Sequence, residues 1–152
     1  MAVTVTATTI AIESVITGVH HLYGAILEAD LFGAHVVLVV LFAGLVTALL
    51  LRRHLRRTRD GAPWGFIAFA SLFYVGWWGL FEGAYNHTAK QVLHLVGASE
   101  ESLRRLFPVK FEVPRDAFFE ATGMLTFVAS LGVAWSLWGM ARYREHLCRQ
   151  AT

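Results

Sequence analysis

Residues 31–59, LFGAHVVLVVLFAGLVTALLLRRHLRRTR, decide the fold. The part from Leu31 to Leu51 is almost entirely Leu, Val, Phe, Ala and Gly, and the eight residues after it contain five arginines. An apolar run of about 20 residues crosses the ~30 Å hydrocarbon core of a bilayer when it is helical. Within lipid, a single segment can satisfy its own backbone hydrogen bonds only as a helix. The stretch therefore predicts a transmembrane helix followed by an arginine-rich loop.

Three further segments share this length and character. Of the 152 residues, 56% are hydrophobic and 16% are charged, against about 45–50% and about 25% in soluble domains. The predicted spans are residues 8–28, 31–51, 64–86 and 117–140. We therefore predict an all-α integral membrane protein, a single transmembrane domain over residues 1–152, in which four helices form an up-down bundle in contact with the lipid bilayer.

The charges between the spans predict their orientation. On one side lie eight basic residues, Arg52, Arg53, Arg56, Arg57, Arg59, Arg142, Arg144 and Arg149, with the acids Asp60 and Glu145. The other side has five basic residues, Lys90, Arg104, Arg105, Lys110 and Arg115, and six acids, Glu28, Asp30, Glu100, Glu101, Glu112 and Asp116. The positive-inside rule places the arginine loop and both termini in the cytoplasm (N-in/C-in). The predicted location is a cell membrane, either a bacterial-type inner membrane or a plasma membrane.

One connection, residues 87–116, is long, and it lies on the extracytoplasmic side in this topology. It has no low-complexity run, so we expect an ordered loop. Gly97 is placed to stop the third helix. Ser99 is placed to cap a short amphipathic helix with acids in its first turn, which Pro108 would end. Asp116 is placed to cap the fourth span.

Several classes of function find no support in the composition. The single cysteine, Cys148, excludes disulfide chemistry and Cys-rich zinc or iron–sulfur sites within one chain. No basic patch interleaved with aromatics indicates a nucleic-acid partner. The N-terminus lacks the positively charged start of a secretory signal, so we interpret it as mature sequence.

Polar and small residues form one stripe on the first span. At 100° per residue, this stripe contains Thr9, Glu13, Thr17, His20, His21, Gly24 and Glu28, while Ile, Val and Leu fill the remaining face. In a membrane, such a stripe faces protein or water rather than lipid.

The other spans bring similar groups to the same depth, the outer half of the membrane. An ionisable side chain costs roughly 2.5–3.5 kcal/mol at the centre of a span, so such groups are expected to satisfy one another. The candidate metal ligands are His20, His21, His35, Glu82, His87 and Glu120. The candidates for a proton relay or for groups that orient the ligands are Glu13, Glu28, Asn86 and His94.

Imidazole and carboxylate donors suit a transition metal such as Fe, Cu or Zn, and two facing histidines could instead hold haem. The predicted function is therefore a metal- or haem-binding membrane protein, with redox activity as a consequence of iron or copper. The spacing matches neither Glu-x-x-His nor His-Glu-x-x-His, because Glu82 and His87 are five residues apart. No motif defines a reaction or catalytic residues, so enzymatic activity stays open.

Two alternatives remain. The stripe that contains Glu13 could line a path for a proton-coupled transport module, although spans two and four offer few polar groups to continue it. The chain could also be an accessory or structural subunit of a larger membrane complex, or a homo-oligomer, in which the polar groups only hold the helices together.

Overall fold

The computed structural model describes residues 2–28, 31–56, 64–107 and 116–150, and within them the side chains of residues 3–27, 35–56, 64–107 and 116–142. All its regular elements are helical: α1 (Ala2–Glu28), α2 (Leu31–Arg56), α3 (Trp64–Ala70), η1 (Ser71–Ala89), α4 (Lys90–Leu95), α5 (Glu100–Leu106) and α6 (Ala117–Gln150). The prediction of an all-α chain is therefore confirmed for these residues.

Four of the helical segments are long and apolar enough to cross a membrane, as predicted. They are Val3–Leu27, His35–Arg56, Trp64–Leu95 and Ala117–Arg142. The third comprises α3, η1 and α4 in succession and continues beyond the predicted end at residue 86. By length and composition, the chain is a membrane protein.

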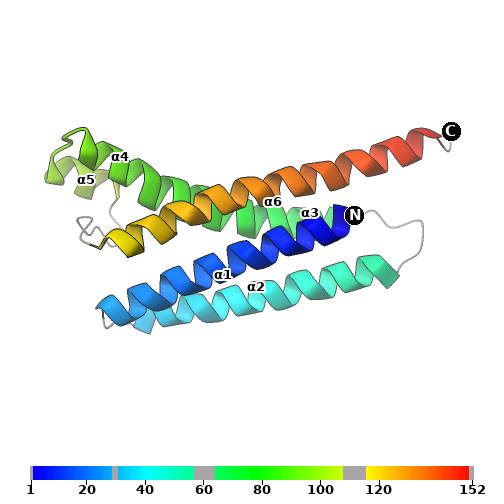
Figure 1. Ribbon diagram of the computed structural model, residues 1–152, viewed down its shortest axis with the longest axis horizontal. Helices are drawn as coiled ribbons and strands as arrows, with labels where there is room; N and C mark the ends of the chain where they lie inside the picture. The colour runs from blue at the N-terminus through cyan, green and yellow to red at the C-terminus, as the bar shows by residue number, and fades with distance from the viewer. Residues whose placement is uncertain (1, 29–30, 57–63, 108–115, 151–152) are drawn as a thin grey trace.

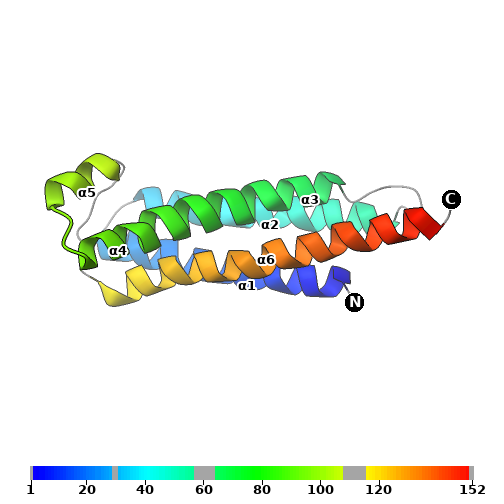
Figure 2. The same ribbon diagram turned by 90° about the horizontal axis from the view of Figure 1, so that it is seen from above.

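The long helices lie side by side (Figures 1 and 2). Helix α1 packs against α2 and α6, α6 also packs against η1, and α2 packs against α3. The start of α1 and the end of α6 lie at one end of the molecule, and α4 and α5 lie at the other (Figure 1). Because α1 and η1 both pack against α6, the polar side chains of these three helices lie near one another.

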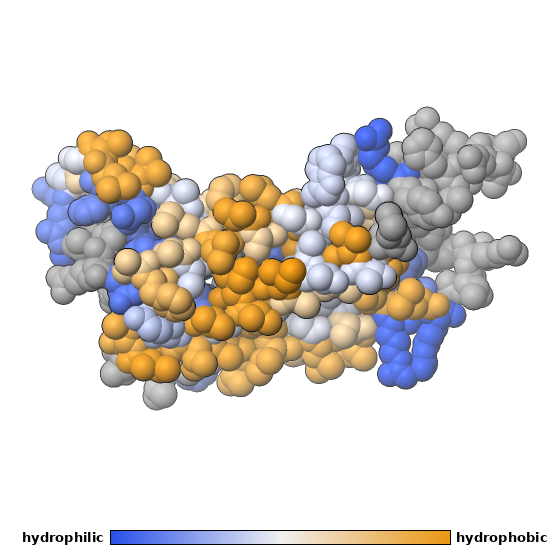
Figure 3. Space-filling model, in the orientation of Figure 1, coloured by the Kyte–Doolittle hydropathy of each residue, from blue (hydrophilic) through white to orange (hydrophobic). Residues whose placement is uncertain are grey.

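The distribution of side chains is the reverse of that in a soluble protein. Large apolar side chains are exposed on all four long helices, for example Ile26, Leu41, Leu72 and Trp135. Figure 3 shows hydrophobic residues across the middle of one face and hydrophilic residues toward both ends. The buried polar residues are Thr6, Glu13, Thr17, His20, Thr47, His87, Lys90, Glu120, Thr126, Ser130 and Ser136. Lipid contact explains both the apolar exterior and the polar interior.

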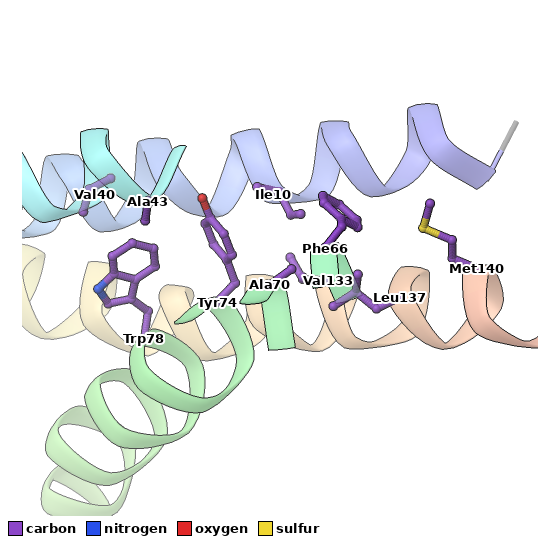
Figure 4. Packing of buried hydrophobic residues seen from close by; sticks show 10 residues of the cluster. All are labelled: Ile10, Val40, Ala43, Phe66, Ala70, Tyr74, Trp78, Val133, Leu137 and Met140. Atoms are coloured by element: carbon purple, nitrogen blue, oxygen red, sulfur yellow. The ribbon is translucent and has the colours of Figure 1, made fainter. Parts of the chain in front are cut away.

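An apolar core fills the part of the molecule away from α4 and α5. Its buried residues are Ile10, Val40, Ala43, Phe66, Ala70, Tyr74, Trp78, Val133, Leu137 and Met140. Tyr74 and Trp78 project from η1 toward α1 and α2 (Figure 4), and the Tyr74 hydroxyl accepts a hydrogen bond from Thr47 at 3.3 Å. This packing fixes the third helix from Trp64 to Trp78 against its neighbours.

The middle of the third helix is π-helical, from Ser71 to Ala89. In a π-helix, each backbone N–H donates to the carbonyl oxygen five residues earlier in the chain, rather than four as in an α-helix. Residues five apart therefore lie on the same face. The buried positions follow this wider period: Tyr74, Trp78, Gly79, Gly83 and His87.

Glycine permits close approach of η1 and α6. A Cβ at Gly83 would lie 2.5 Å from the backbone nitrogen of Phe127, closer than real contacts allow. The backbones of η1 and α6 therefore approach each other closely at Gly83 and Phe127. This contact sets the depth at which His87 and α6 side chains face each other.

The connection at the α4 end has well-defined local signals. Gly97 takes a positive φ of 87°, and its N–H bonds to the carbonyl of His94 at 3.1 Å, which ends α4. Ser99 caps α5 by accepting a hydrogen bond from Ser102 N at 3.2 Å. Gly97 and Ser99 thus act where the sequence places them, whereas Pro108 lies outside the described residues.

Asp116 begins α6 and ties it to α1. Its carboxylate accepts a hydrogen bond from the backbone N–H of Phe119 at 2.8 Å and another from the Tyr23 hydroxyl at 3.0 Å. The bond from Phe119 and the bond from Tyr23 both lower the pKa of Asp116 below its usual value.

We expect Asp116→Ala to lower the melting temperature at neutral pH, because the capping bond and the Tyr23 contact are lost. A carboxyl with a lowered pKa stabilises the folded state above its unfolded pKa, about 3.9. That contribution disappears as pH falls through the lower folded pKa, so the difference between wild type and variant should shrink in acid. Melting curves at several pH values in detergent would check this, with Asp116→Asn as the control that caps without charge. A difference that is constant with pH would contradict the assignment.

Candidate metal centre

A cluster of ionisable side chains lies between α1, η1 and α6. Helix α1 provides His20, η1 provides Glu82 and His87, and α6 provides Glu120. The Oε1 atom of Glu82 lies 3.9 Å from His20 Nε2 and 3.5 Å from His87 Nε2. His20 and His87 are in edge contact, with ring centroids 4.6 Å apart. The structure therefore brings these predicted histidines and glutamates together.

The π-helical register explains why Glu82 and His87 converge. In an α-helix, residues five apart point about 140° away from each other. The wider turn of η1 places them on one face, so that Glu82 reaches the ring of His87. Short π-helical insertions are frequent at functional sites, and here the π-helix creates the pair.

A threonine of α6 orients His20. Thr122 Oγ1 donates its hydrogen to backbone carbonyls of its own helix, those of Phe118 at 2.8 Å and Phe119 at 3.0 Å. Its contact with His20 Nδ1 at 3.0 Å therefore has the imidazole as donor. The proton of the neutral imidazole is therefore on Nδ1. Nε2 carries the lone pair and faces Glu82. His20 Nε2 is buried and has no hydrogen-bond partner among the described residues.

A second chain of contacts orients His87. Its Nδ1 lies 2.9 Å from Glu120 Oε2 and donates to that carboxylate. The other oxygen of Glu120 lies 3.3 Å from the Nζ of Lys90, and both side chains are 8% exposed. Lys90 therefore neutralises Glu120, and Glu120 holds the ring of His87 with Nε2 toward Glu82.

Glu82 is held in place from its own helix, since Asn86 Nδ2 donates to Glu82 Oε2 at 2.9 Å. Its Oε1 is then directed to the histidines. In the part of the chain that the structure describes, the donors close enough to share one ion are His20, His21 and Glu82, whose ligand atoms lie within 4.8 Å of one another. Each of His20, His87 and Glu82 thus has a partner that fixes its orientation, as ligands of metal ions usually have.

An aromatic side chain covers the cluster. The ring of Phe119 stacks on His20 with centroids 4.3 Å apart and meets His87 edge-on at 5.2 Å. A Cβ at Gly24 would lie 2.6 Å from this ring, so glycine leaves the room that Phe119 occupies. The stack limits the freedom of both imidazoles and excludes water from one side.

Other predicted site residues lie elsewhere. His35 on α2 and His94 on α4 are exposed, and the structure does not bring them to the group that surrounds Glu82. Glu13 is buried on α1, two turns from His20. The side chain of Glu28 and the whole of Asp30 are outside the described set.

Sequence reasoning missed three members of the cluster: Thr122, Phe119 and the buried partner Lys90. Lys90 had a signal, because a lysine that follows His87 by three residues on a long apolar helix falls near the same face. Thr122 and Phe119 had none, since their role depends on how α6 is rotated against α1.

The imidazole of His87 rests against Gly123. A Cβ at this position would overlap the ring of His87. We expect Gly123→Ala to cost about 1–3 kcal/mol of stability, the usual penalty of overpacking, and to displace His87 from Glu82. Unfolding measurements in detergent would check the stability.

Gly139→Ala is the matched control on α6, because a Cβ there meets nothing within 4 Å. Alanine at such a helical position is expected to stabilise by about 0.4–1 kcal/mol. Equal effects of the two substitutions would contradict the tight contact between Gly123 and His87.

These observations define the class: an all-α membrane protein with a buried histidine and glutamate group that could hold a metal ion. Comparison with protein-family models, with curated proteins and with solved structures gives no significant match.

Proposed function

We propose that the protein binds one divalent transition-metal ion between α1, η1 and α6, with His20, His21 and Glu82 as ligands and His87 completing the set. The four long helices span a cell membrane as an up-down bundle, with both termini and the arginine-rich connection in the cytoplasm. The α4–α5 end, and with it the metal, then lies toward the extracytoplasmic face. The excess of basic residues at the opposite end supports this orientation.

The observation that carries the proposal is the buried lone pair of His20. Thr122 fixes the tautomer, and Nε2 faces Glu82 without a hydrogen bond of its own. If the cluster served only to hold helices together, a buried imidazole would be expected to use both nitrogens. A metal ion between His20 Nε2 and Glu82 Oε1 satisfies this nitrogen.

The distances fit an ion after small movements. Two ligands about 2.0–2.1 Å from a tetrahedral zinc ion lie roughly 3.3 Å apart. The separations of Glu82 Oε1 from the ring nitrogens, 3.5 Å for His87 and 3.9 Å for His20, are slightly larger. Rotation of side chains within their present rotamers closes such gaps.

Charge also favours a cation. Lys90 neutralises Glu120, which leaves Glu82 as the carboxylate without a lysine or arginine partner in the cluster. A divalent ion would take the place of the positive charge that a protonated His87 otherwise brings to Glu82. Two or three imidazoles with one carboxylate suit zinc or iron, and an iron ion would give the site redox activity.

The same geometry argues for an ion rather than haem. Axial haem ligands lie on opposite sides of the porphyrin plane. The rings of His20 and His87 touch, with centroids 4.6 Å apart, and leave no room for a porphyrin between them.

Titration of the purified full chain with Zn²⁺, Co²⁺ and Fe²⁺, with metal analysis after dialysis, tests the proposal. We expect saturable binding of one ion per chain, and with Co²⁺ a visible spectrum that reports its coordination. Absence of saturable binding of all three ions would refute the proposal. The accessory-subunit interpretation would then be favoured, with the cluster as an ion-pair network between helices.

A further inference from the structure

A line of buried and half-buried hydroxyls with one buried carboxyl runs along α1 from its start to His20. Its members are Thr6, Thr9, Glu13, Thr17 and His20, spaced by three or four residues, so they share one face of the helix. Thr6, Glu13 and Thr17 are fully buried, and His20 is 1% exposed. We call this set the α1 seam.

Helix α6 supplies hydroxyls opposite the seam. Ser136 Oγ lies 3.2 Å from Thr9 Oγ1, and Thr122 meets His20 as described above. Between these two contacts, α6 also carries the buried Thr126 and Ser130, the second of which lies against Gly79 of η1. The four hydroxyl residues of span four are Thr122, Thr126, Ser130 and Ser136, and each donates to a backbone carbonyl of its own helix.

Glu13 is the unusual member of the seam. Both of its carboxyl oxygens are buried, and neither has a hydrogen-bond partner among the described residues. The hydroxyl of Thr17, one turn closer to the cluster, is also without a partner there. Buried polar atoms nearly always have a partner, often ordered water, so we expect water to hydrogen-bond to these atoms.

We propose that Glu13 carries protons along the α1 seam between the start of α1 and Nε2 of His20, the nitrogen of the proposed metal centre that can accept a proton when no ion is bound to it. The centre is the destination, so the inference rests on the proposed function, whereas the seam itself does not depend on metal. At each step, one O–H bond forms as the neighbouring one breaks, and no electron moves. A threonine hydroxyl can accept one proton while it donates another, and a water molecule bridges each interval of about 6 Å per four residues.

The surroundings leave Glu13 as the only acid at this depth. On α6, no titratable residue occurs between Glu120 and Arg142, and on α2 none occurs between His35 and Arg52. On the third helix, the only one before Glu82 is Tyr74, whose hydroxyl accepts a hydrogen bond from Thr47. Glu13 therefore has no cation to pair with, and a carboxyl in hydrocarbon without such a partner rests in its neutral, proton-bearing form.

Infrared spectroscopy of the full chain in lipid nanodiscs, without added metal, tests this. We expect a carbonyl band of a protonated carboxyl that disappears in Glu13→Gln and shifts in Glu13→Asp, the second variant serving if the first does not fold. The time course of its isotope shift after transfer into D₂O measures how quickly Glu13 exchanges its proton.

Thr9→Val and Thr17→Val remove one hydroxyl on each side of Glu13 without changing side-chain size. We expect each to slow the exchange and the double variant to slow it by roughly tenfold or more, as one lost hydrogen-bonded step in the path requires. Thr126→Val is the matched control, because it removes a buried hydroxyl of α6 that is not a member of the α1 seam; that hydroxyl donates to the carbonyl of Thr122 at 3.2 Å, much as Thr9 donates to the carbonyl of Thr6 at 3.0 Å. In this variant, Glu13 should exchange its proton at the wild-type rate.

Two results would overturn the inference: absence of a protonated-carboxyl band assigned to Glu13, or an unchanged exchange rate in the double variant. An effect of Thr9→Val without any effect of Thr17→Val would remove the link to the metal centre. Because the measurement contains no metal, failure of metal binding would leave it unaffected, and the two proposals can fail separately.

Discussion

Glu82→Gln is expected to abolish tight metal binding while leaving the fold intact. Among the residues whose side chains the structure describes, Glu82 is the carboxylate whose oxygen faces both His20 Nε2 and His87 Nε2, at 3.9 and 3.5 Å. Glutamine keeps the size and can still accept the hydrogen bond from Asn86, but it lacks the charge that balances a divalent cation. Loss of a partner that merely orients a ligand costs about 10–100-fold in affinity, so loss of the anionic ligand should cost more.

The measurement is the affinity for Co²⁺ and Zn²⁺ in the purified full chain, and Glu13→Gln is the matched control. Both substitutions change a buried or half-buried glutamate to glutamine on a helix that lines the interior, but Glu13 is two turns from His20. Glu13→Gln should bind like wild type. Equal affinity of Glu82→Gln and wild type would mean that the ion, if one binds, is held elsewhere.

The positions of the long apolar helices were predictable from the sequence, because they depend on the composition of many consecutive residues. The run from Leu31 to Leu51 is too apolar for anything but a lipid-facing helix, and α2 covers all of it. Local signals at Gly97 and Ser99 were equally clear, since a positive φ and a side-chain cap depend on the residue itself.

The candidate site was predictable only as a set of residues. Burial of ionisable groups in a membrane is so costly that His20, Glu82 and His87 had to meet something polar. Their mutual geometry was not predictable, because it depends on the π-helical turns of η1. At the α-helical period, Glu82 and His87 diverge.

The partners that orient the ligands were invisible for a different reason. Thr122 matters because its hydroxyl is already used by backbone carbonyls, which makes it an acceptor for His20. That inference needs the rotation of α6 against α1, which close contacts such as Gly24 with Phe119 determine. Whether the assembled residues bind an ion stays a prediction.

The ion pair between Lys90 and Glu120 is the second place where we expect a single substitution to change the protein's stability strongly. Their charged atoms lie 3.3 Å apart, and both side chains are 8% exposed. We expect Glu120→Gln to destabilise the protein by about 3–5 kcal/mol, because it leaves the ammonium of Lys90 buried without a countercharge. His87 loses little in this variant, since the glutamine oxygen can still accept the hydrogen bond from its Nδ1.

The double variant Lys90→Met/Glu120→Gln separates two contributions to the free energy of unfolding: the loss caused by one unpaired buried charge, and the net stabilisation by the ion pair. Replacing a buried ion pair by neutral groups of similar size is often neutral or stabilising, so the second substitution should restore most of the lost stability. Unfolding titrations in mixed micelles of wild type, both single variants and the double variant give the coupling energy directly. If Lys90→Met failed to rescue Glu120→Gln, the instability would come from His87 rather than from Lys90. Glu120 would then act chiefly by holding the imidazole toward Glu82, and the same variant should lose metal affinity in proportion.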